Sequence, residues 1–248
     1  MVLRNGVALG YPFDMAIRSL QRACDDVIIG IDPGDDDTLD RVRALGVNVV
    51  ETRWDMSNHA GHTNCEISVQ TQRLCDMVPD GWILSLQADE VIHEGEVETI
   101  RDAIEVCEKS GLTGIRMLRL YFYGGLATIR TDWTIWMVRL FKAGMWKPYV
   151  DGAMRFDPID PKDMAVSIRP YIWHYSRMGD PAMVAERVRN LDGFFHAPES
   201  IGQAAPYDFG TTRKLDTYAT DAKIEQVSDV LEPFDVHRHP AEARRLYL

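Results

Sequence analysis

The sequence lacks any long apolar run. No stretch approaches the roughly 20 apolar residues that span a bilayer, and the segment from Met1 to Phe13 is interrupted by Arg4, Asn5 and Pro12. A secretory signal peptide needs a continuous apolar segment. We therefore expect neither a signal peptide nor a membrane span, and predict a soluble protein.

Basic residues are outnumbered by acidic ones. The chain has 27 Lys and Arg against 38 Asp and Glu, which gives a formal net charge of -11. Proteins that hold DNA or RNA independently of sequence need a basic surface to displace counterions. The charge balance argues against that class, while it leaves room for a local basic groove.

Cysteine is also scarce, and no C-x-x-C pair occurs. The four cysteines lie among residues with a helical pattern: Cys24, Cys65, Cys75 and Cys107. This usage predicts reduced, partly buried thiols in a cytoplasmic protein.

Several familiar catalytic motifs are missing. The sequence has no G-x-G-x-x-G after its first strand, no G-x-x-x-x-G-K-[ST], no H-E-x-x-H and no G-x-S-x-G. A dinucleotide oxidoreductase, a P-loop enzyme and a serine hydrolase therefore gain no support.

What is present is an alternation of short apolar runs with helical patterns. The run D-D-V-I-I-G-I-D, residues 25–32, predicts a buried parallel strand within a βαβαβ order that continues to Thr52. Further helices are predicted over 65–77, 97–107 and 181–195. We expect an α/β fold with an open, mostly parallel central sheet flanked by helices, whose ligands bind beyond the carboxyl ends of the strands.

The second half of the chain differs in character. Strands rich in β-branched and aromatic residues predict a small additional β region, and the residues from Ala197 onward predict an extension on the surface. We expect a first domain over residues 1–177, and a helical segment with a C-terminal extension over 178–248 packed on it.

The most informative stretch is W-I-L-S-L-Q-A-D-E, from Trp82 to Glu90, where an apolar run ends in a glutamine and two carboxylates. Two ionised carboxylates at the edge of a core need a cation, a hydrogen-bond donor or water. Asp32 ends another predicted strand, and His174 lies in an aromatic strand. Because hard divalent cations prefer carboxylate oxygens, acids that converge with an imidazole suit a metal–diphosphate site.

Three segments in this order resemble a known family. They are D-P-G-D-D-D-T from Asp32, W-I-L-S-L-Q-A-D-E from Trp82, and R-L-F-K-A-G-M-W-K-P-Y-V-D-G from Arg139. Over residues 1–177 the chain resembles the family-2 nucleotide-sugar glycosyltransferases with a GT-A fold. The resemblance implies a metal-dependent, inverting transfer of a sugar from a nucleoside diphosphate to an acceptor that the sequence does not identify.

The resemblance also implies roles for donor-binding residues. Asp32 would contact the nucleoside, and Asn5 would lie beside the same pocket. One acidic residue of the loop after Asp32 would also contact the donor; we name Asp36, with Asp35 and Asp37 as alternatives. Gln70 would lie near the nucleotide or sugar, and Gln87 takes the first position of the family's D-x-D motif, where its amide can hydrogen-bond a hydroxyl.

For the chemistry, the resemblance implies that Asp89 binds a divalent cation, Mn²⁺ or Mg²⁺, and that His174 supplies a further ligand. Asp151 would be the base that deprotonates the acceptor. Without the resemblance, V-D-G at Asp151 is an ordinary turn sequence, His174 a hydrogen-bonded, half-buried histidine, and the acidic loop a helix cap.

Two other functions stay open. Gln87 in place of an aspartate, together with a short first strand, also suits a non-catalytic nucleotide- or carbohydrate-binding protein. A metal-dependent phosphohydrolase would use the same acids, without a recognisable hydrolase motif.

Four arginines in the second half form a local excess of positive charge: Arg116, Arg119, Arg130 and Arg139. They suit contacts with phosphate or an anionic acceptor. Solvated strand faces explain them almost as well.

Overall fold

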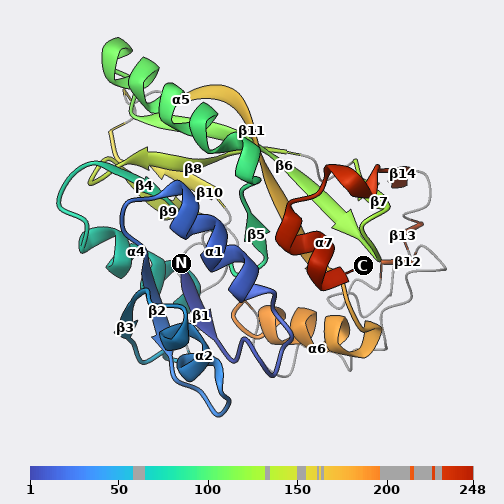
Figure 1. Cartoon of the computed structure of the whole chain (residues 1–248). Helices are drawn as coiled ribbons and strands as arrows, with labels where there is room; N and C mark the ends of the chain where they lie inside the picture. Colours follow the sequence, from blue (N-terminus) through green and yellow to red (C-terminus); the bar gives the residue numbers. More distant parts are fainter. Residues whose placement is uncertain are drawn as a thin grey trace.

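The computed structural model describes residues 1–57, 65–131, 135–149, 155–160, 162, 165–195, 213–214, 225–226 and 231–247 (Figure 1). None of the helices in these ranges is long and apolar enough to cross a membrane.

The N-terminal part is a parallel sheet with its helices. The order is β1 (Val2–Arg4), α1 (Phe13–Ala23), β2 (Ile28–Asp32), α2 (Thr38–Ala44) and β3 (Asn48–Glu51). Strand β2 lies between β1 and β3 and pairs with both in parallel. The predicted βαβαβ order is therefore confirmed.

Helix α1 packs on this sheet through residues at helical spacing. Phe13 and Ile17 join one hydrophobic cluster with Ile29 and Ile31 of β2. The spacing places these side chains on one face of the helix, which explains why the segment folds as it does.

A larger, mixed sheet follows. Its strands are β4 (Trp82–Leu84), β5 (Glu90–Val91), β6 (Gly114–Tyr123), β7 (Thr128–Arg130), β8 (Trp136–Lys142), β11 (Ala165–Arg177) and β14 (Leu231–Pro233). The order β14-β7-β6-β11-β5 is extended by β8, which pairs with β6 and with β4. Only β11 and β6 are parallel, and every other pairing in this sheet is antiparallel.

The prediction of a mostly parallel central sheet is therefore wrong. Parallel neighbours need a crossover, usually a helix, between them. Helices alternate with strands only as far as α5 (Val97–Ser110), and from β6 to β8 the strands follow one another without a helix among the described residues. Such strands pair antiparallel.

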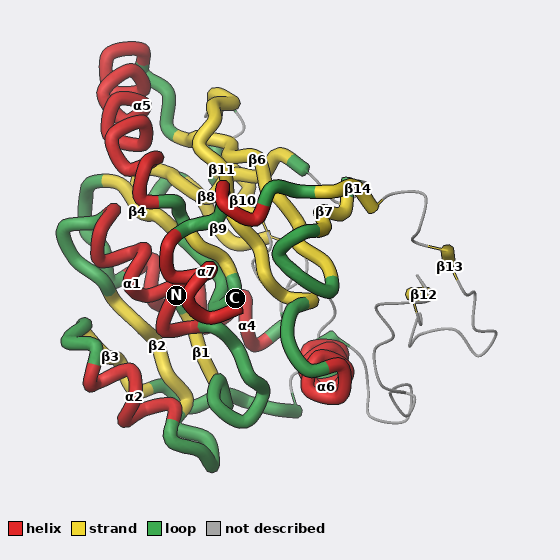
Figure 2. Tube along the Cα trace, turned by 45° about the vertical axis from the view of Figure 1, so that its right-hand side comes forward, coloured by secondary structure: helices red, strands yellow, loops and turns green. Residues whose placement is uncertain are grey.

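The remaining helices match the predicted segments. They are α4 (Glu66–Asp76), α5 and α6 (Pro181–Asp192). The Asp180 side chain caps α6 by accepting hydrogen bonds from the backbone N of Ala182 and of Met183. Two short ladders complete the described strands, β9 (Trp146–Tyr149) with β10 (Arg155–Pro158), and β12 (Arg213–Lys214) with β13 (Glu225–Gln226). Figure 2 shows the parallel sheet with α1 and α2 on one side of the molecule and α6 on the other.

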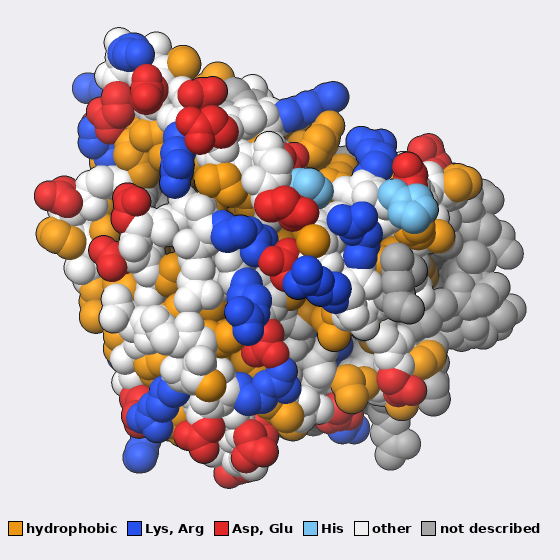
Figure 3. Space-filling view, in the orientation of Figure 1, with side chains coloured by type: hydrophobic (Ala, Val, Ile, Leu, Met, Phe, Trp, Pro, Cys, Tyr) orange, Lys and Arg blue, Asp and Glu red, His pale blue; other side chains and the backbone are white. Residues whose placement is uncertain are grey.

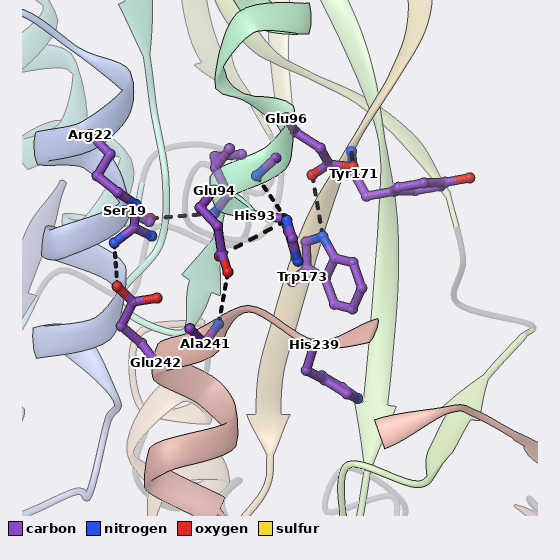
Figure 4. Close-up of polar contacts among 12 residues, drawn as sticks. Ser19, Arg22, His93, Glu94, Glu96, Tyr171, Trp173, His239, Ala241 and Glu242 are labelled. Atoms are coloured by element: carbon purple, nitrogen blue, oxygen red, sulfur yellow. Dashed lines mark hydrogen bonds and ion pairs between the residues drawn. The ribbon is translucent and has the colours of Figure 1, made fainter. Parts of the chain in front are cut away.

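The C-terminal segment returns to the body of the molecule. It contains β14, the 3₁₀ helix η4 (Val236–Arg238) and α7 (Ala241–Tyr247). Glu242 forms an ion pair with Arg22 of α1, and the backbone N of Ala241 donates to Glu94 at 3.2 Å (Figure 4). Whether residue 177 divides two domains stays a prediction.

The surface in Figure 3 carries acidic and basic side chains interspersed over the face it shows. The four cysteines are free thiols, three of them buried and Cys24 half-buried.

Candidate functional site

The acidic stretch lies in a buried turn. Strand β4 ends at Leu84, Ala88 and Asp89 form the turn, and Glu90 begins β5. The sequence had suggested that Asp89 lies at the end of a strand; in the structure it lies in the turn between β4 and β5. Asp89 is 6% exposed and Glu90 is 0% exposed, so neither carboxylate is at the surface.

Glu90 is held by a buried ion pair. Its Oε1 accepts from Arg139 Nη2 at 2.7 Å, and its Oε2 accepts from the backbone N of Gln87 at 2.9 Å. Both charged side chains are almost fully enclosed. Because an unpaired charge in such a place is costly, this pair fixes the position of the turn.

Asp89 faces His174, which lies on β11 opposite Glu90. His174 Nε2 is 3.5 Å from Asp89 Oδ1, and both side chains are buried. The two residues predicted as metal ligands thus lie together. Burial lowers the pKa of His174, against the attraction of Asp89, so its ring is neutral at pH 7.

Asp89 stays ionised. Burial opposes its charge, but His174 and the cations of Arg187 and Arg177 hold the pKa of the carboxyl below its usual value.

The donors at this turn suit a divalent cation in kind but not in number. A separation of 3.5 Å fits two neighbouring ligands of one ion, each at about 2.1 Å from it. However, no cluster of three His, Cys, Asp or Glu side chains that could hold a metal occurs among the described residues. A cation bound here would need further oxygen atoms from a ligand.

His174 belongs to a row of buried polar side chains across four strands. Register pairs join Glu90 to His174, His174 to Tyr121 of β6, and Tyr121 to Arg130 of β7. Residues paired in this way point to the same face of the sheet. We call these four residues the polar row, and none of them is more than 5% exposed.

Three of the four arginines that the sequence singled out are buried here. Arg119, Arg130 and Arg139 are 3%, 3% and 1% exposed, while Arg116 is exposed. Solvated strand faces are therefore the wrong explanation for three of them, and the right one for Arg116.

Asn5 and Asp32 come together through the pairing of β1 with β2, in which Arg4 lies opposite Asp32. Asp32 accepts from the backbone N of Trp54 at 2.9 Å and of Gly34 at 3.1 Å. Asn5 has a φ of 50° and its Oδ1 accepts from the backbone N of Asp35 at 3.4 Å. These bonds shape the loops at the ends of both strands.

Asp36 is engaged within the protein. It accepts from the backbone N of Ala8 at 2.8 Å and of Thr38 at 3.0 Å. Partial burial opposes its charge, yet these bonds hold the pKa of Asp36 below its usual value. Asp36 therefore links the loop after β1 to the start of α2.

Gln70 is buried, and Nε2 donates to the carbonyl of Arg53 at 3.3 Å and to Glu66, while Oε1 accepts from Arg73 at 3.3 Å. Ligand contacts by Asp36 and Gln70 stay predictions.

The Gln87 side chain is half-buried, and its amide has no hydrogen-bond partner among the described residues. Asp151, the predicted base, lies outside the described residues.

Sequence reasoning missed Arg187. This α6 residue is 2% exposed and donates to the carbonyls of Leu9 at 3.0 Å, Gly10 at 2.7 Å and Ser176 at 2.9 Å. It thereby ties the loop after β1 to β11. Its place on the buried face of α6, three residues after Val184, was the signal in the sequence.

No family model and no curated protein matches the chain. Among solved structures, S. aureus TarS matches with a TM-score of 0.44 and 13% identity, covering 77% of this chain and 38% of that one. TarS 1-349 matches with the same score and identity, with 62% of its length covered, or 63% in its complex with UDP. The chain thus spans less than two thirds of each structure. At such scores the function has to be argued from the site itself.

Proposed function

We propose that this chain is a metal-dependent, inverting glycosyltransferase that moves a sugar from a nucleoside diphosphate to an acceptor hydroxyl. The observation that carries the proposal is the contact between Asp89 and His174, at 3.5 Å in a buried turn. Both residues have the role of metal ligands in the family that the sequence resembles, and they reach this turn from distant parts of the chain.

Asp89 and His174 would hold the cation, and oxygens of the donor diphosphate would complete its coordination. When bound, such a cation neutralises the negative charge that develops on the leaving diphosphate. The neutral imidazole of His174 and the ionised carboxylate of Asp89 have the protonation states that this requires.

Asp151 would take the proton of the acceptor hydroxyl. The acceptor oxygen then bonds to the anomeric carbon as the bond from that carbon to the diphosphate oxygen breaks, which inverts the configuration. Asn5 and Asp32 would face the nucleoside, and the amide of Gln87 would bond a hydroxyl of the donor. Asp36 and Gln70 would act beside them by fixing the neighbouring loops.

A non-catalytic nucleotide- or carbohydrate-binding protein is the second candidate. It is favoured by one observation, the neutral Gln87 where the family has an aspartate, which leaves fewer anionic ligands for a cation. This candidate binds the same nucleotide but does not turn over a donor sugar.

The test is thermal stability with a panel of nucleoside diphosphates, with and without Mn²⁺, in wild type and Asp89→Asn. A ligand that binds only the folded state raises the midpoint of unfolding. We expect one nucleotide to raise it in a Mn²⁺-dependent manner, and the rise to vanish in Asp89→Asn but not in the exposed control Asp80→Asn. No rise with any nucleotide at millimolar concentration would overturn the donor site. Binding without release of nucleotide from any donor sugar would favour the second candidate.

A further inference from the structure

Three buried arginines differ in what holds their charge. Arg139 pairs with Glu90 at 2.7 Å, and Arg187 donates to three backbone carbonyls. Arg119 is as deeply buried as they are, at 3% exposed, but its Nε is buried and has no hydrogen-bond partner among the described residues. A buried N–H without an acceptor is destabilising, because it loses its hydrogen bond to water and gains none.

Arg119 lies on β6 two residues before Tyr121, so both side chains leave the strand on the same face as the polar row. The Arg119 Cζ is 5.7 Å from the centre of the Tyr121 ring. That ring is in turn 4.9 Å from the ring of His174. The guanidinium is therefore directed along β6 toward the polar row.

A second nitrogen in the same place also lacks a partner. His174 Nδ1 is buried and has no hydrogen-bond partner among the residues described. A histidine that binds a metal through one nitrogen donates a hydrogen bond through the other. If Nε2 binds a cation, Nδ1 carries the proton, and no described residue accepts it.

The nearby carboxylates do not fill the gap. Glu90 is engaged by Arg139, and Asp89 faces His174. Both attract Arg119 through space, but neither lies within ion-pair distance of it. Among the described residues, therefore, no carboxylate forms an ion pair with Arg119.

We propose that Arg119 is the anchor of an oxyanion-binding site, which takes a phosphate or carboxylate group of a ligand at the polar row. A planar guanidinium can hold two oxygens of such a group at once. The proposal deepens the proposed function and rests on it for a diphosphate as the ligand. An acidic sugar would supply the same chemistry through its carboxylate.

The test uses the full chain in EDTA with two probes, inorganic pyrophosphate and glucuronate. We expect one of them to raise the midpoint of unfolding of wild type, and Arg119→Met to bind it at least about tenfold more weakly, since a hydrogen bond to a charged group contributes about 1.5–3 kcal/mol. Arg116→Met removes the same charge from an exposed position of β6 and should bind like wild type. A response to pyrophosphate assigns the site to phosphate, and a response to glucuronate assigns it to an acidic sugar.

Stability without a ligand separates this role from a structural one. Arg119→Met should unfold at the same temperature as wild type or higher, because the substitution removes a buried N–H that has no acceptor. Arg119→Lys keeps the charge but not the planar fork, and should bind with intermediate affinity.

Wild-type binding of the responding probe by Arg119→Met, or no response of wild type to either probe, would overturn the oxyanion site. Loss of pyrophosphate binding in Arg119→Met without any sugar transfer by wild type would uphold the site while the proposed function fails. Mn²⁺-dependent transfer and pyrophosphate binding that are both unchanged in Arg119→Met would uphold the proposed function and overturn the oxyanion site.

Discussion

Two buried histidines, His174 and His239, lie in this protein in opposite circumstances. His239 lies against Phe122, Trp173 and Phe234, and both of its ring nitrogens are bonded, Nε2 to the carbonyl of Leu126 at 2.8 Å and Nδ1 to the Tyr175 hydroxyl at 3.0 Å. His174 has Nε2 3.5 Å from Asp89, while its Nδ1 has no hydrogen-bond partner in the described part of the chain.

The surroundings of His239 fix its tautomer. A carbonyl only accepts, so Nε2 carries the proton and Nδ1 accepts from Tyr175. His239 is thus complete within the protein and serves the fold. His174 is incomplete, and Arg119 beside it is incomplete in the same way. The difference separates a buried polar group that holds the chain together from the two that we propose to bind a ligand.

The largest effect is expected from changing Asp89 or His174. We expect Asp89→Asn or His174→Gln to lower sugar transfer by about 100-fold or more, as loss of a metal-holding group does. Their free energy of unfolding, measured in urea, should change less than their transfer rate. Equal transfer by Asp89→Asn and wild type at saturating Mn²⁺ would contradict the proposed role of Asp89 as a metal ligand.

Arg187 provides the complementary case of a complete group. Arg187→Met leaves three buried carbonyls without donors, so we expect a loss of about 3 kcal/mol in the free energy of unfolding. Arg119→Met should show no such loss. Equilibrium unfolding in urea compares the two variants directly, and a similar cost for both would mean that Arg119 is as structural as Arg187.

His239 should make folding sensitive to acid. Burial lowers the pKa of His239 to about 4 from 6.5, so the unfolded chain binds a proton first as the pH falls. The contribution of His239 to stability is therefore full above pH 6.5 and is lost as the pH falls toward 4. His239→Gln should be less stable than wild type at pH 7, by about 2 kcal/mol, and should show a flatter slope in this window. A series of urea midpoints against pH measures it, and an unchanged slope would contradict it.

Glu96 should make stability depend on pH with the opposite sign. Burial raises the pKa of Glu96 to about 7, although the backbone N of Tyr171 and Trp173 Nε1 donate to it (Figure 4). The unfolded carboxyl ionises near 4.5, so this contribution to stability is full below pH 4.5 and is lost as the pH rises through 7.

Glu96→Gln keeps only one of the two acceptor oxygens and cannot ionise, so we expect it to be less stable than wild type at acid pH by about 1 kcal/mol and to lose no further stability as the pH rises through 7. The same urea series tests this, with Glu98→Gln on the exposed side of α5 as the control. A variant whose stability falls with rising pH as steeply as that of wild type would contradict this prediction.

The sequence indicated the parallel N-terminal unit and the helices well, because their apolar spacing is local. Helical spacing placed Phe13 and Ile17 on one face, and the structure packs them on β2. The direction of the strands in the second half depends on pairings between distant segments. Nothing in W-I-L at residues 82–84 says that β4 pairs with β8, or that β11 lies parallel to β6.

In the site, residue type alone pointed to the acidic turn and to His174. That they lie in contact could not be predicted without the fold. Burial was the information that the sequence lacked most. Arg116 and Arg119 look alike three positions apart on one strand, yet one is exposed and the other enclosed. Asp36 and Gln70 looked available for a ligand, but the bonds that engage them come from residues far along the chain, such as Ala8 and Arg53.

The return of the C-terminal segment has a consequence for biosynthesis. Phe234, His239, Ala243 and Tyr247 cover aromatic residues of β6 and β11, such as Phe122 and Tyr175. During translation those strands leave the ribosome well before their cover does. Until then an apolar face is bare, so the nascent chain is open to aggregation or to chaperone capture at this face, and the face is covered only once α7 has emerged.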